Sequence, residues 1–246
     1  MGKERLDTRL VASGLVPTRS RARDLIQRGF VSVDGAVCEK PSREIDVTSR
    51  LTVSDQAPAF VSRGAEKLVA ALDHFRLPVE GRIALDIGAS TGGFTQVLLQ
   101  RGAHKVYAVD VGTAQLHPSL LSDPRITAIE QRDARTLTRD MIPDAAGVIV
   151  ADVSFISLTK VLPPALRLSA PGCSLIALIK PQFEVGPSLV GKGGIVRDAA
   201  ARKAAIDAVA AFLAAQPGWR VLEPIVSPIL GGSGNEEYLI GARRDD

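Results

Sequence analysis

The chain contains few of the residues that build disulfide-stapled folds and metal centres. Its 246 residues include two cysteines, three histidines and one tryptophan, and aromatic residues make up only 4%. Two cysteines are too few for a disulfide framework or a thiolate metal site, so we interpret Cys38 and Cys173 as small apolar core residues. His74, His104 and His117 lack metal-ligand spacing, and we therefore expect no metal site.

Long apolar segments are also missing. No run approaches the roughly 20 apolar residues that a membrane-spanning helix requires. The charged N-terminal residues lack the apolar core of a secretory signal peptide. We therefore expect a cytoplasmic protein without a membrane partner, and nothing in the sequence indicates an obligatory protein partner. With 46% hydrophobic residues, the chain can still bury one or two substantial cores.

Positive charge is modest overall but concentrated near the N-terminus. The formal net charge is +3, whereas residues 1–30 hold seven lysines and arginines against three acidic residues. Six of the seven are arginines, and four of these lie close together, at positions 19, 21, 23 and 28. Arginines at the start and along one side of a helix form a surface that binds phosphate groups. A solvated helix face is the alternative interpretation of the same pattern.

Local patterns near the N-terminus predict two short helices followed by a hairpin. Apolar residues at helical spacing predict a helix over residues 5–13 and a second helix that Ser20 caps and Gly29 ends. Residues 30–37 alternate around an Asp-Gly turn, which predicts a β-hairpin. A unit of this size is only marginally stable by itself.

The order of motifs in this region resembles the S4 RNA-binding domain. Over about residues 4–55, the matching residues are Arg5-Leu6-Asp7, Leu10-Val11, Gly14-Leu15-Val16, Ser20-Arg21, Ala22, Ile26, Gly29 and Val31-Ser32-Val33-Asp34-Gly35. S4 domains bind structured RNA through its shape and backbone charge, which agrees with the scarcity of aromatic residues for base stacking. The resemblance implies RNA contacts by Arg5, Arg19, Ser20, Arg21, Arg23 and Arg28, and we expect the same of Arg63, which lies beyond the matching region.

After this first domain, over residues 1–56, we expect a linker over residues 57–63 and a second domain over residues 64–246. Seven apolar strand candidates alternate with helical segments there, at residues 83–87, 105–109, 126–130, 148–151, 175–179, 220–225 and 238–242. This alternation predicts an α/β fold with a doubly wound, seven-stranded, Rossmann-like sheet. The last two strands have no room for a crossover helix between them, so we expect them to be antiparallel neighbours.

A glycine-rich turn follows the first of these strands, in the segment IALDIGASTGGF at residues 83–94. A dinucleotide fingerprint requires glycine at position 90, which is serine, and a P-loop requires lysine at position 94, which is phenylalanine. The turn therefore lacks a cation for phosphate groups. It suits a ligand with an adenosine part and an amino-acid part but no phosphate, and S-adenosylmethionine has this composition.

Acidic residues follow the next two strands. Asp110 lies 18 residues beyond Gly92, where doubly wound folds place the acid that accepts ribose hydroxyls. A helix cap is the structural alternative for such a residue. Asp133 follows the third strand, and a resemblance to methyltransferases places it opposite the adenine amino group. An ordinary loop aspartate is the alternative for this position.

Four further polar residues stand at the ends of predicted elements. Lys67 opens the helix after the linker, and Glu237 precedes the last strand. Asp152 and Lys180 follow the fourth and fifth strands. Because strand ends in an open α/β sheet face the ligand crevice, we expect the four side chains to converge there.

This set can support methyl transfer to a ribose 2′-hydroxyl, which needs a base. A lysine amine can serve where burial and a nearby cation lower its pKa from the usual ~10.4. We assign Lys180 as the base and Asp152 as a bridge to the methyl donor. Lys67 and Glu237 would orient the base. Two ordinary lysine–carboxylate salt bridges are the alternative.

Five motifs in order resemble the TlyA/hemolysin A family, which joins an S4 domain to an FtsJ-like methyltransferase domain. They are SRGAEKL (62–68), DIGASTGGFT (86–95), ADVSFIS (151–157), KPQFE (180–184) and GGIVRD (193–198), and SPI (227–229) with GNEEY (234–238) completes the match. The resemblance implies S-adenosylmethionine-dependent 2′-O-methylation of cytidine in ribosomal RNA. The family's Lys–Asp–Lys–Glu tetrad maps onto Lys67, Asp152, Lys180 and Glu237, with Glu236 left open as the fourth member.

The same resemblance implies a cofactor site and a substrate. The implied cofactor contacts are Asp86, Gly88, Ser90, Gly92, Gly93, Phe94, Asp110, Val111, Asp133, Ala134, Asp152 and Phe155. Longer family members act on both ribosomal subunits, and shorter ones act on the large subunit alone. This chain resembles the shorter type, so we expect 23S rRNA as the substrate, free or in a ribosomal subunit, with 16S rRNA as a further candidate.

Two other classes of function match parts of the sequence. The hemolysin name of the family suggests a membrane-active toxin, but the chain shows no secretory signal and no strongly amphipathic pore-forming segment. A non-catalytic RNA-binding protein would keep the sheet without its chemistry. The intact glycine loop and the four tetrad positions favour an enzyme instead.

Overall fold

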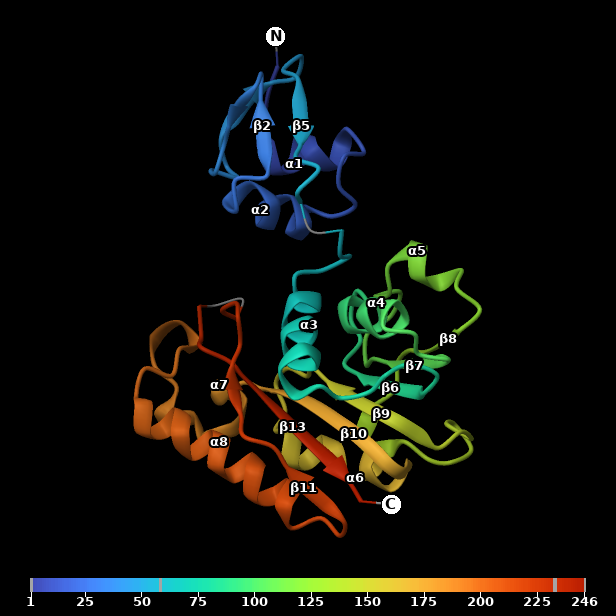
Figure 1. Ribbon diagram of the computed structural model, residues 1–246. Coiled ribbons are helices and arrows are strands. Elements are labelled where there is room, and N and C mark those ends of the chain that lie inside the picture. Colours follow the sequence, from blue (N-terminus) through green and yellow to red (C-terminus); the bar gives the residue numbers. More distant parts are fainter. Residues whose placement is uncertain (1, 58, 232–233, 246) are drawn as a thin grey trace. The chain divides into compact units, whose positions relative to one another are not determined.

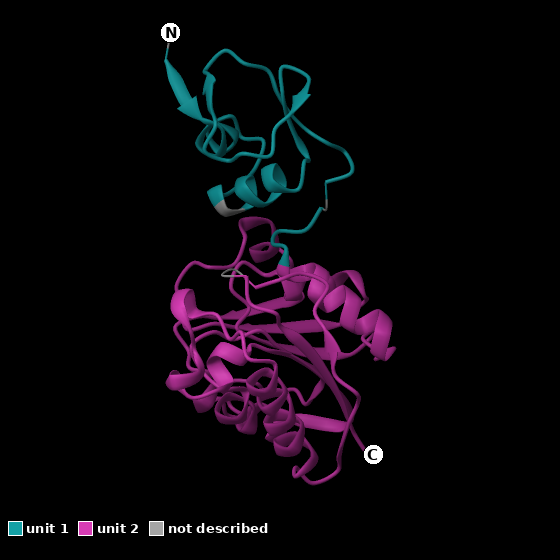
Figure 2. Cartoon of the chain, turned by 90° about the vertical axis from the view of Figure 1, so that its left-hand side faces the viewer, with its two compact units in different colours: residues 1–63 teal, residues 64–246 magenta. Residues whose placement is uncertain are grey.

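The chain folds as two units, residues 1–63 and residues 64–246 (Figure 2). The computed structural model describes residues 2–57, 59–231 and 234–245, and it describes Ser20 by its backbone alone. The second unit begins at Gly64, and the segment that the sequence assigns to a linker is counted with the first unit.

The first unit is a small α+β fold with an apolar core of its own. Its helices are α1 (Leu6–Ala12) and α2 (Arg19–Gln27). Its strands are β1 (Lys3–Arg5), β2 (Val31–Val33), β3 (Ala36–Val37), β4 (Glu44–Asp46) and β5 (Leu51–Val53), paired antiparallel as β1–β4 and β3–β2–β5. The hairpin is confirmed, because Asp34 and Gly35 both adopt the positive φ that a tight Asp-Gly turn requires. Leu6, Leu10 and Ile26 are fully buried in the core.

The second helix begins earlier than the sequence predicts. Thr18, and not Ser20, is its N-terminal cap, because Thr18 keeps an extended backbone and its hydroxyl accepts the backbone N–H of Arg21 at 3.2 Å. Ser20 already has a helical backbone, whereas a capping residue lies just outside the helix. The Ser20 side chain lies outside the described part of the structure.

The second unit is built on a mixed eight-stranded sheet (Figure 1). Its strands are β6 (Ile83–Ile87), β7 (Lys105–Val109), β8 (Ile126–Ile129), β9 (Ala146–Ala151), β10 (Ser169–Ile179), β11 (Trp219–Val221), β12 (Ile225–Val226) and β13 (Tyr238–Arg244). Their order is β11-β13-β10-β9-β6-β7-β8, with β12 also paired to β13. The five strands from β10 to β8 are parallel, and β13 is antiparallel to each of its partners. The antiparallel arrangement expected of the last strands is confirmed.

One predicted strand is divided in two. The sequence predicts a single strand over residues 220–225, whereas β11 ends at Val221 and β12 begins at Ile225. Pro224 separates them because it has no backbone N–H to donate to the ladder. The sheet therefore has eight strands instead of seven, although both short strands still pair with β13.

Helices cover both faces of this sheet (Figure 1). The longer ones are α3 (Gly64–Phe75), α4 (Gly93–Gln100), α6 (Leu158–Arg167) and α8 (Ala199–Ala214), and the short ones are α5 (Pro118–Leu121), α7 (Pro181–Glu184), η1 (Ala134–Thr136), η2 (Pro187–Leu189) and η3 (Lys192–Gly194). α3 and α4 pack together on one face, and α6 and α8 pack together on the other. The central strands are consequently buried on both sides, as successive residues 148–151 of β9 show.

The structure bears on what the composition indicates about cysteines, membrane-spanning helices and metal-binding groups. Both cysteines are buried, and burial raises the pKa of the Cys173 thiol to about 12, in agreement with a core role. Within residues 2–57, 59–231 and 234–245, no helix is both long and apolar enough to span a bilayer. In the same part of the chain, no three His, Cys, Asp or Glu side chains are grouped so that they could hold a metal ion.

Candidate active site

Strand ends bring the expected site residues to one edge of the second unit's sheet. β6, β7, β9 and β10 are parallel, so the residues that follow them lie at the same edge. These residues are Gly88, Asp110, Asp152 and Lys180. β13 runs in the opposite direction, and its first residue, Tyr238, pairs with Ile179 at the end of β10. Glu237, which precedes β13, therefore reaches this edge as well.

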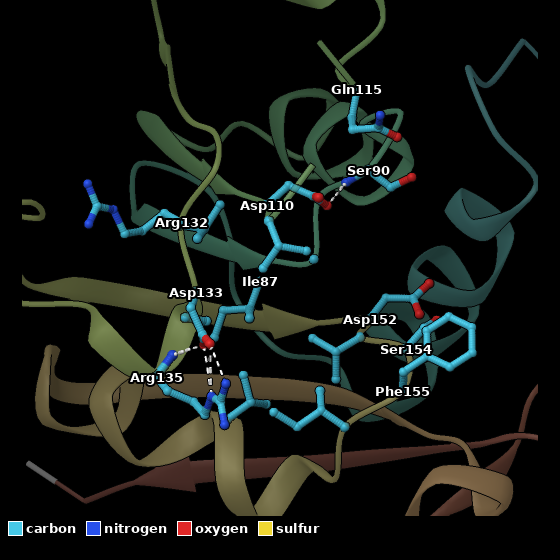
Figure 3. Close-up of a pocket in the computed structure, with 17 residues that line it drawn as sticks. Ile87, Ser90, Asp110, Gln115, Arg132, Asp133, Arg135, Asp152, Ser154 and Phe155 are labelled. Carbon is cyan, nitrogen blue, oxygen red and sulfur yellow. Dashed lines mark hydrogen bonds and ion pairs between the residues drawn. The ribbon is translucent and has the colours of Figure 1, made fainter. Parts of the chain in front are cut away.

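A cavity of about 560 Å³ opens at this edge (Figure 3). Eight of the expected cofactor residues line it: Gly88, Ser90, Asp110, Val111, Asp133, Ala134, Asp152 and Phe155. The other lining residues are Ile87, Val109, Gln115, Arg132, Arg135, Val153, Ser154, Ile156 and Val161. Figure 3 shows Ser90 beside Asp110 in one part of the wall and Asp152, Ser154 and Phe155 in another. The volume lies within the range of about 300–1,000 Å³ that is typical of small-molecule sites.

Gly88 is required where the glycine loop passes β9. It has a φ of +79°, and a Cβ at this position would collide with the backbone carbonyl oxygen of Asp152. Ser90 has a φ of +47°, which is strained for a residue with a side chain. Its backbone N–H donates to Asp110 Oδ2 at 2.8 Å, and this bond fixes the loop in the strained form.

Asp110 and Asp133 both line the cavity, and both also brace their own loops. Asp110 accepts the backbone N–H groups of Ser90 and, at 2.7 Å, of Gly112. Asp133 caps η1 and accepts Arg135 Nε at 2.9 Å, and the side-chain and backbone hydrogen bonds from Arg135 lower the pKa of its carboxyl group. A carboxylate has about four acceptor positions, so Asp110 keeps acceptor capacity for a ligand. Arg135 makes four hydrogen bonds to Asp133, so a ligand would have to displace part of that contact.

Four expected cofactor residues lie behind the cavity wall instead of in it: Asp86, Gly92, Gly93 and Phe94. Phe94 is buried in the core, and Gly92 caps α4 at a φ of +93°. Asp86 is fully buried and accepts the Thr95 hydroxyl at 2.6 Å, while its Oδ1 has no hydrogen-bond partner within the described residues. Burial raises the pKa of Asp86 to about 7, and the charges of Asp152 and Asp110 add to the effect. The structure thus gives these four residues a supporting position.

Lys180 contacts two residues that line the cavity. Its Nζ forms an ion pair with Asp152 Oδ1 at 2.7 Å and donates a hydrogen bond to Ser154 Oγ at 2.9 Å. Asp152 and Ser154 both line the cavity. Sequence reasoning missed Ser154, although its place two residues after Asp152 in the same loop was a usable signal. The amine is therefore held beside the cavity by one charged and one neutral acceptor.

The second lysine of the expected tetrad, Lys67, forms a buried ion pair with a residue far away in the sequence. Lys67, on α3, pairs with Glu237, and both side chains are almost completely buried. Gly231 leaves the space for this carboxylate, because a Cβ there would collide with Glu237 Oε1. Glu236 points elsewhere: it contacts the Tyr238 hydroxyl and lies 3.4 Å from Arg202 Nε. The geometry therefore favours Glu237 over Glu236 as the partner of Lys67.

Family models match nearly the whole chain. The model of FtsJ-like methyltransferases matches residues 60–244, and the model of the S4 domain matches residues 4–51. A Mycobacterium tuberculosis protein, 16S/23S rRNA (cytidine-2′-O)-methyltransferase TlyA, is 46% identical over 98% of this chain and 90% of its own length. The chain belongs to the TlyA/hemolysin A family. The resemblance noted in the sequence is confirmed, and the cavity lies in the methyltransferase domain.

Family members with a hemolysin name share the same domains. Hemolysin A from Brachyspira hyodysenteriae is 41% identical over 96% of this chain and 98% of its own length. A solved structure from Streptococcus thermophilus, described as a hemolysin, matches with a TM-score of 0.78 and 41% identity over 100% of this chain and 90% of that one. The two kinds of name therefore occur among close relatives of one methyltransferase fold.

The methyltransferase domain of this family member carries an exposed aromatic residue at the cavity. Phe155 is 90% exposed and has a φ of +65°, which is unusual for a bulky side chain. Its ring packs against Phe183 with 5.0 Å between the centroids. Sequence reasoning listed Phe155 as a cofactor contact and missed Phe183. The exposure of Phe155 leaves one ring face free to receive a flat ligand.

The S4 domain places its arginines in two different environments. Arg5, Arg19 and Arg23 surround Asp7 and remain about half exposed. Arg21, which the sequence assigns to RNA, is buried and donates to Asp24 Oδ2 at 3.1 Å, so it is a structural residue. Arg21 faces inward because it lies in the first turn of α2, on the side of the helix that packs against the core.

Arg28 and Arg63 complete the expected RNA-binding set. Arg28 lies 3.7 Å from the same Asp24 and stacks over the Phe30 ring at 5.2 Å, while Arg63 is exposed.

Proposed function

We propose that this protein transfers a methyl group from S-adenosylmethionine to the ribose 2′-hydroxyl of a cytidine in ribosomal RNA, with 23S rRNA as the substrate. The observation that carries the proposal is the Lys180–Asp152 pair, which lies at the wall of a nucleotide-sized cavity at the carboxyl edge of the sheet. Cytidine 2′-O-methylation follows the name of the Mycobacterium tuberculosis relative, a 16S/23S rRNA methyltransferase, and 23S rRNA is the substrate that it shares with a Campylobacter jejuni relative named 23S rRNA (cytidine-2′-O)-methyltransferase TlyA. Cytoplasmic ribosomes are the corresponding site of action.

The cavity has the chemistry that S-adenosylmethionine requires. Gly88 lets the loop lie against β9, which leaves the cavity open to a ligand between the two strand ends. Asp110 offers free acceptor positions for ribose hydroxyls, and Asp133 would accept an adenine amino group in place of part of its contact with Arg135. The Oδ1 of buried Asp86 has no hydrogen-bond partner among the residues that the structure describes, which favours a cationic ligand nearby. When bound, the cofactor supplies an electrophilic methyl group on a sulfonium.

Lys180 is the proposed general base. A neutral amine can accept the proton that the 2′-hydroxyl loses as its oxygen attacks the methyl carbon. Asp152 holds Nζ by an ion pair, and Ser154 Oγ accepts one of its hydrogens. These two contacts fix the direction of the nitrogen and leave one position on it for the proton that it would accept. Asp152 lines the cavity itself and thus links the base to the cofactor side.

Lys67 and Glu237 are proposed to keep this edge of the sheet in its working geometry. Two opposite charges that are buried together need each other, because either one alone would be left without water or a partner. Their pairing fixes the start of β13 to α3, and Tyr238 at that start pairs with the last residue of β10 beside Lys180. The pair therefore positions the base without contact with substrate.

The target nucleotide is proposed to leave its stacked position to reach this edge. Enzymes that act on a nucleotide inside a structured duplex commonly extrude it, and aromatic side chains stack on the extruded base. The exposed ring of Phe155 offers such a surface beside Asp152. A 2-aminopurine reporter next to the target should brighten on binding, and an unchanged signal would contradict extrusion.

Ribose-methylation mapping tests the proposed function most directly. Ribosomal RNA from a strain that lacks this gene should lose one 2′-O-methylcytidine in 23S rRNA, and the purified protein with S-adenosylmethionine should restore it. Loss of a methyl group in 16S rRNA as well would extend the substrate to both subunits. Unchanged methylation, together with no S-adenosylmethionine binding by calorimetry in the presence of rRNA, would leave a non-catalytic or membrane-active protein as the better description.

A further inference from the structure

One buried carboxylate gathers three arginines in the S4 domain. Asp7, on α1, is fully buried. Arg5 donates to both of its oxygens at 3.1 Å, through Nε and Nη2. Nε of Arg19 and Nε of Arg23 donate to Asp7 Oδ2 at 3.0 and 2.9 Å. We call Arg5, Arg19 and Arg23 the arginine triad.

The triad carries more positive charge than Asp7 can neutralise. One guanidinium would balance the carboxylate, so three leave a local excess of two positive charges. Burial by itself would raise the pKa of Asp7, but the hydrogen bonds from the triad outweigh it and hold this pKa well below its usual range. Asp7 is therefore a permanent anion at physiological pH, and the triad stays ordered around it.

The triad faces solvent although its anchor does not. The side chains of Arg5, Arg19 and Arg23 are 42%, 49% and 51% exposed, whereas that of Asp7 is 0% exposed. Each guanidinium is planar, and a hydrogen bond at Nε fixes the direction of its outer amino groups. Free arginine side chains lose rotamer entropy when they bind a phosphate, and a fixed arginine has already lost it. The arrangement thus presents three prepared phosphate-binding groups.

We propose that Asp7 is a positioning residue for RNA, which holds Arg5, Arg19 and Arg23 as a rigid site for backbone phosphates of structured ribosomal RNA. The proposal rests on the proposed function insofar as RNA is the substrate. It goes beyond charge alone, because it assigns a favourable role in RNA binding to an acidic residue. RNA in its A-form is recognised mainly through shape and phosphates, which a rigid cationic cluster can match.

The sign of one substitution separates positioning from simple charge. Asp7→Asn removes a negative charge, so charge alone predicts tighter binding to RNA. Positioning predicts the reverse: at least tenfold weaker binding to in-vitro-transcribed 23S rRNA, because the guanidiniums lose their common acceptor. The slope of log affinity against log salt should fall by about 1–2, the loss of one or two phosphate contacts. Affinity for S-adenosylmethionine should not change.

Glu44→Gln is the matched control. Glu44 is exposed on β4 and pairs in register with Arg5 of β1, so it is an acid in the same neighbourhood without a buried role. Its removal should leave RNA affinity unchanged or slightly higher. An Asp7→Asn protein that behaves like Glu44→Gln would overturn the proposal.

A spectroscopic measurement excludes a merely structural effect. In ¹H–¹⁵N spectra, the Nε–H signals of the triad should be dispersed and slow to exchange in the native protein. In Asp7→Asn they should collapse toward the position of free arginine while the backbone amide pattern of the S4 domain stays native. Weaker RNA binding together with unchanged Nε–H signals would contradict positioning.

A charge-conserving variant decides the matter if Asp7→Asn does not fold. Arg19→Lys combined with Arg23→Lys keeps the net charge but removes the planar fork. RNA affinity should fall several-fold, and unchanged affinity would overturn the proposal. Failure of the proposed function is distinguishable, because in that case the native protein would neither bind nor methylate 23S rRNA. A native protein that does both, with variants that bind as it does, contradicts the positioning role alone.

Discussion

The two lysines of the candidate site are held in different ways. Lys67 is buried and pairs with buried Glu237, so a proton cannot easily reach it from substrate. Lys180 sits beside the cavity, and one of its partners, Ser154, is neutral. An amine held by one charged and one neutral acceptor can lose a proton without leaving two carboxylates uncompensated. At the residue scale, this difference assigns base chemistry to Lys180 and positioning to Lys67.

Substitution of Lys180 tests this assignment. Lys180→Ala should abolish methyl transfer, with a loss of at least a hundredfold in kcat, the lower end of what a general base contributes. The cavity wall remains, so S-adenosylmethionine should still bind with a Kd within a few-fold of native by calorimetry. Lys203→Ala, at an exposed lysine on α8, should leave both quantities unchanged. Native turnover by Lys180→Ala would remove this residue from the mechanism.

Asp86 should give the methyltransferase domain a characteristic pH dependence. Its folded pKa of about 7 lies above the ordinary 3.8, so the folded state binds this proton more tightly than the unfolded state. Stability from this group is therefore complete below pH ~4 and falls as pH rises toward ~7. Three pKa units correspond to at most about 4 kcal/mol.

Asp86→Asn removes the titration and should unfold at a higher temperature than the native protein at pH 8. The difference should shrink or reverse at pH 5, because native Asp86 is then largely protonated and uncharged. Thermal unfolding at both pH values measures it. Asp140→Asn, at an exposed position of the same unit, should show no such pH dependence. An equal shift at both pH values would mean that Asp86 is ionised throughout.

At the scale of the element, the turn between β6 and α4 can form only if the residue at position 88 has no side chain. Gly88 and Gly81 both have positive φ, so alanine strains the backbone at either site by about 1 kcal/mol. At Gly88 the new Cβ would also collide with the backbone of Asp152, which follows β9. At Gly81 no described atom lies within 4 Å of the new Cβ. Gly88→Ala should therefore lower stability further and abolish cofactor binding, and Gly81→Ala should keep it. Equal cofactor affinity in both variants would contradict the close approach.

Elements with a strong local pattern were predictable from sequence. Residues 83–87 and 105–109 are apolar runs between turns, and they form β6 and β7 with those bounds. The helix cap was not predictable, because Thr18 and Ser20 are equally plausible caps. The choice between them depends on backbone conformation at single residues, which composition does not reveal. The strand division was predictable, because Pro224 inside the expected strand cannot donate to the ladder, and this signal was missed.

Local sequence patterns predicted the site residues that directly follow an apolar strand. Asp110, Asp152 and Lys180 follow apolar strands, so their common edge follows from the fold class. Lys67 and Glu237 were expected at the same edge from the ends of their elements, but their direct pairing joins residues 170 positions apart and no local pattern indicates it. No local pattern separates buried Arg21 from half-exposed Arg19, because that depends on which side of α2 meets the core.

At the scale of the whole molecule, two separate cores predict two unfolding transitions. The S4 domain has its own cluster around Leu6, Leu10 and Ile26, and the methyltransferase domain has a larger one around its sheet. S-adenosylmethionine at 100 times its Kd should stabilise only the larger domain, by about 2.7 kcal/mol. Calorimetric scans with and without cofactor measure this. A single transition that shifts as one would mean that the domains unfold together.

β13 lies inside the sheet, yet the ribosome makes it after every other strand. A growing chain that has emerged as far as β12 has an open slot beside β10, and it lacks the carboxylate that neutralises Lys67. The N-terminal domain can be complete long before this slot closes. During synthesis, the S4 domain can therefore fold while the methyltransferase sheet is still incomplete.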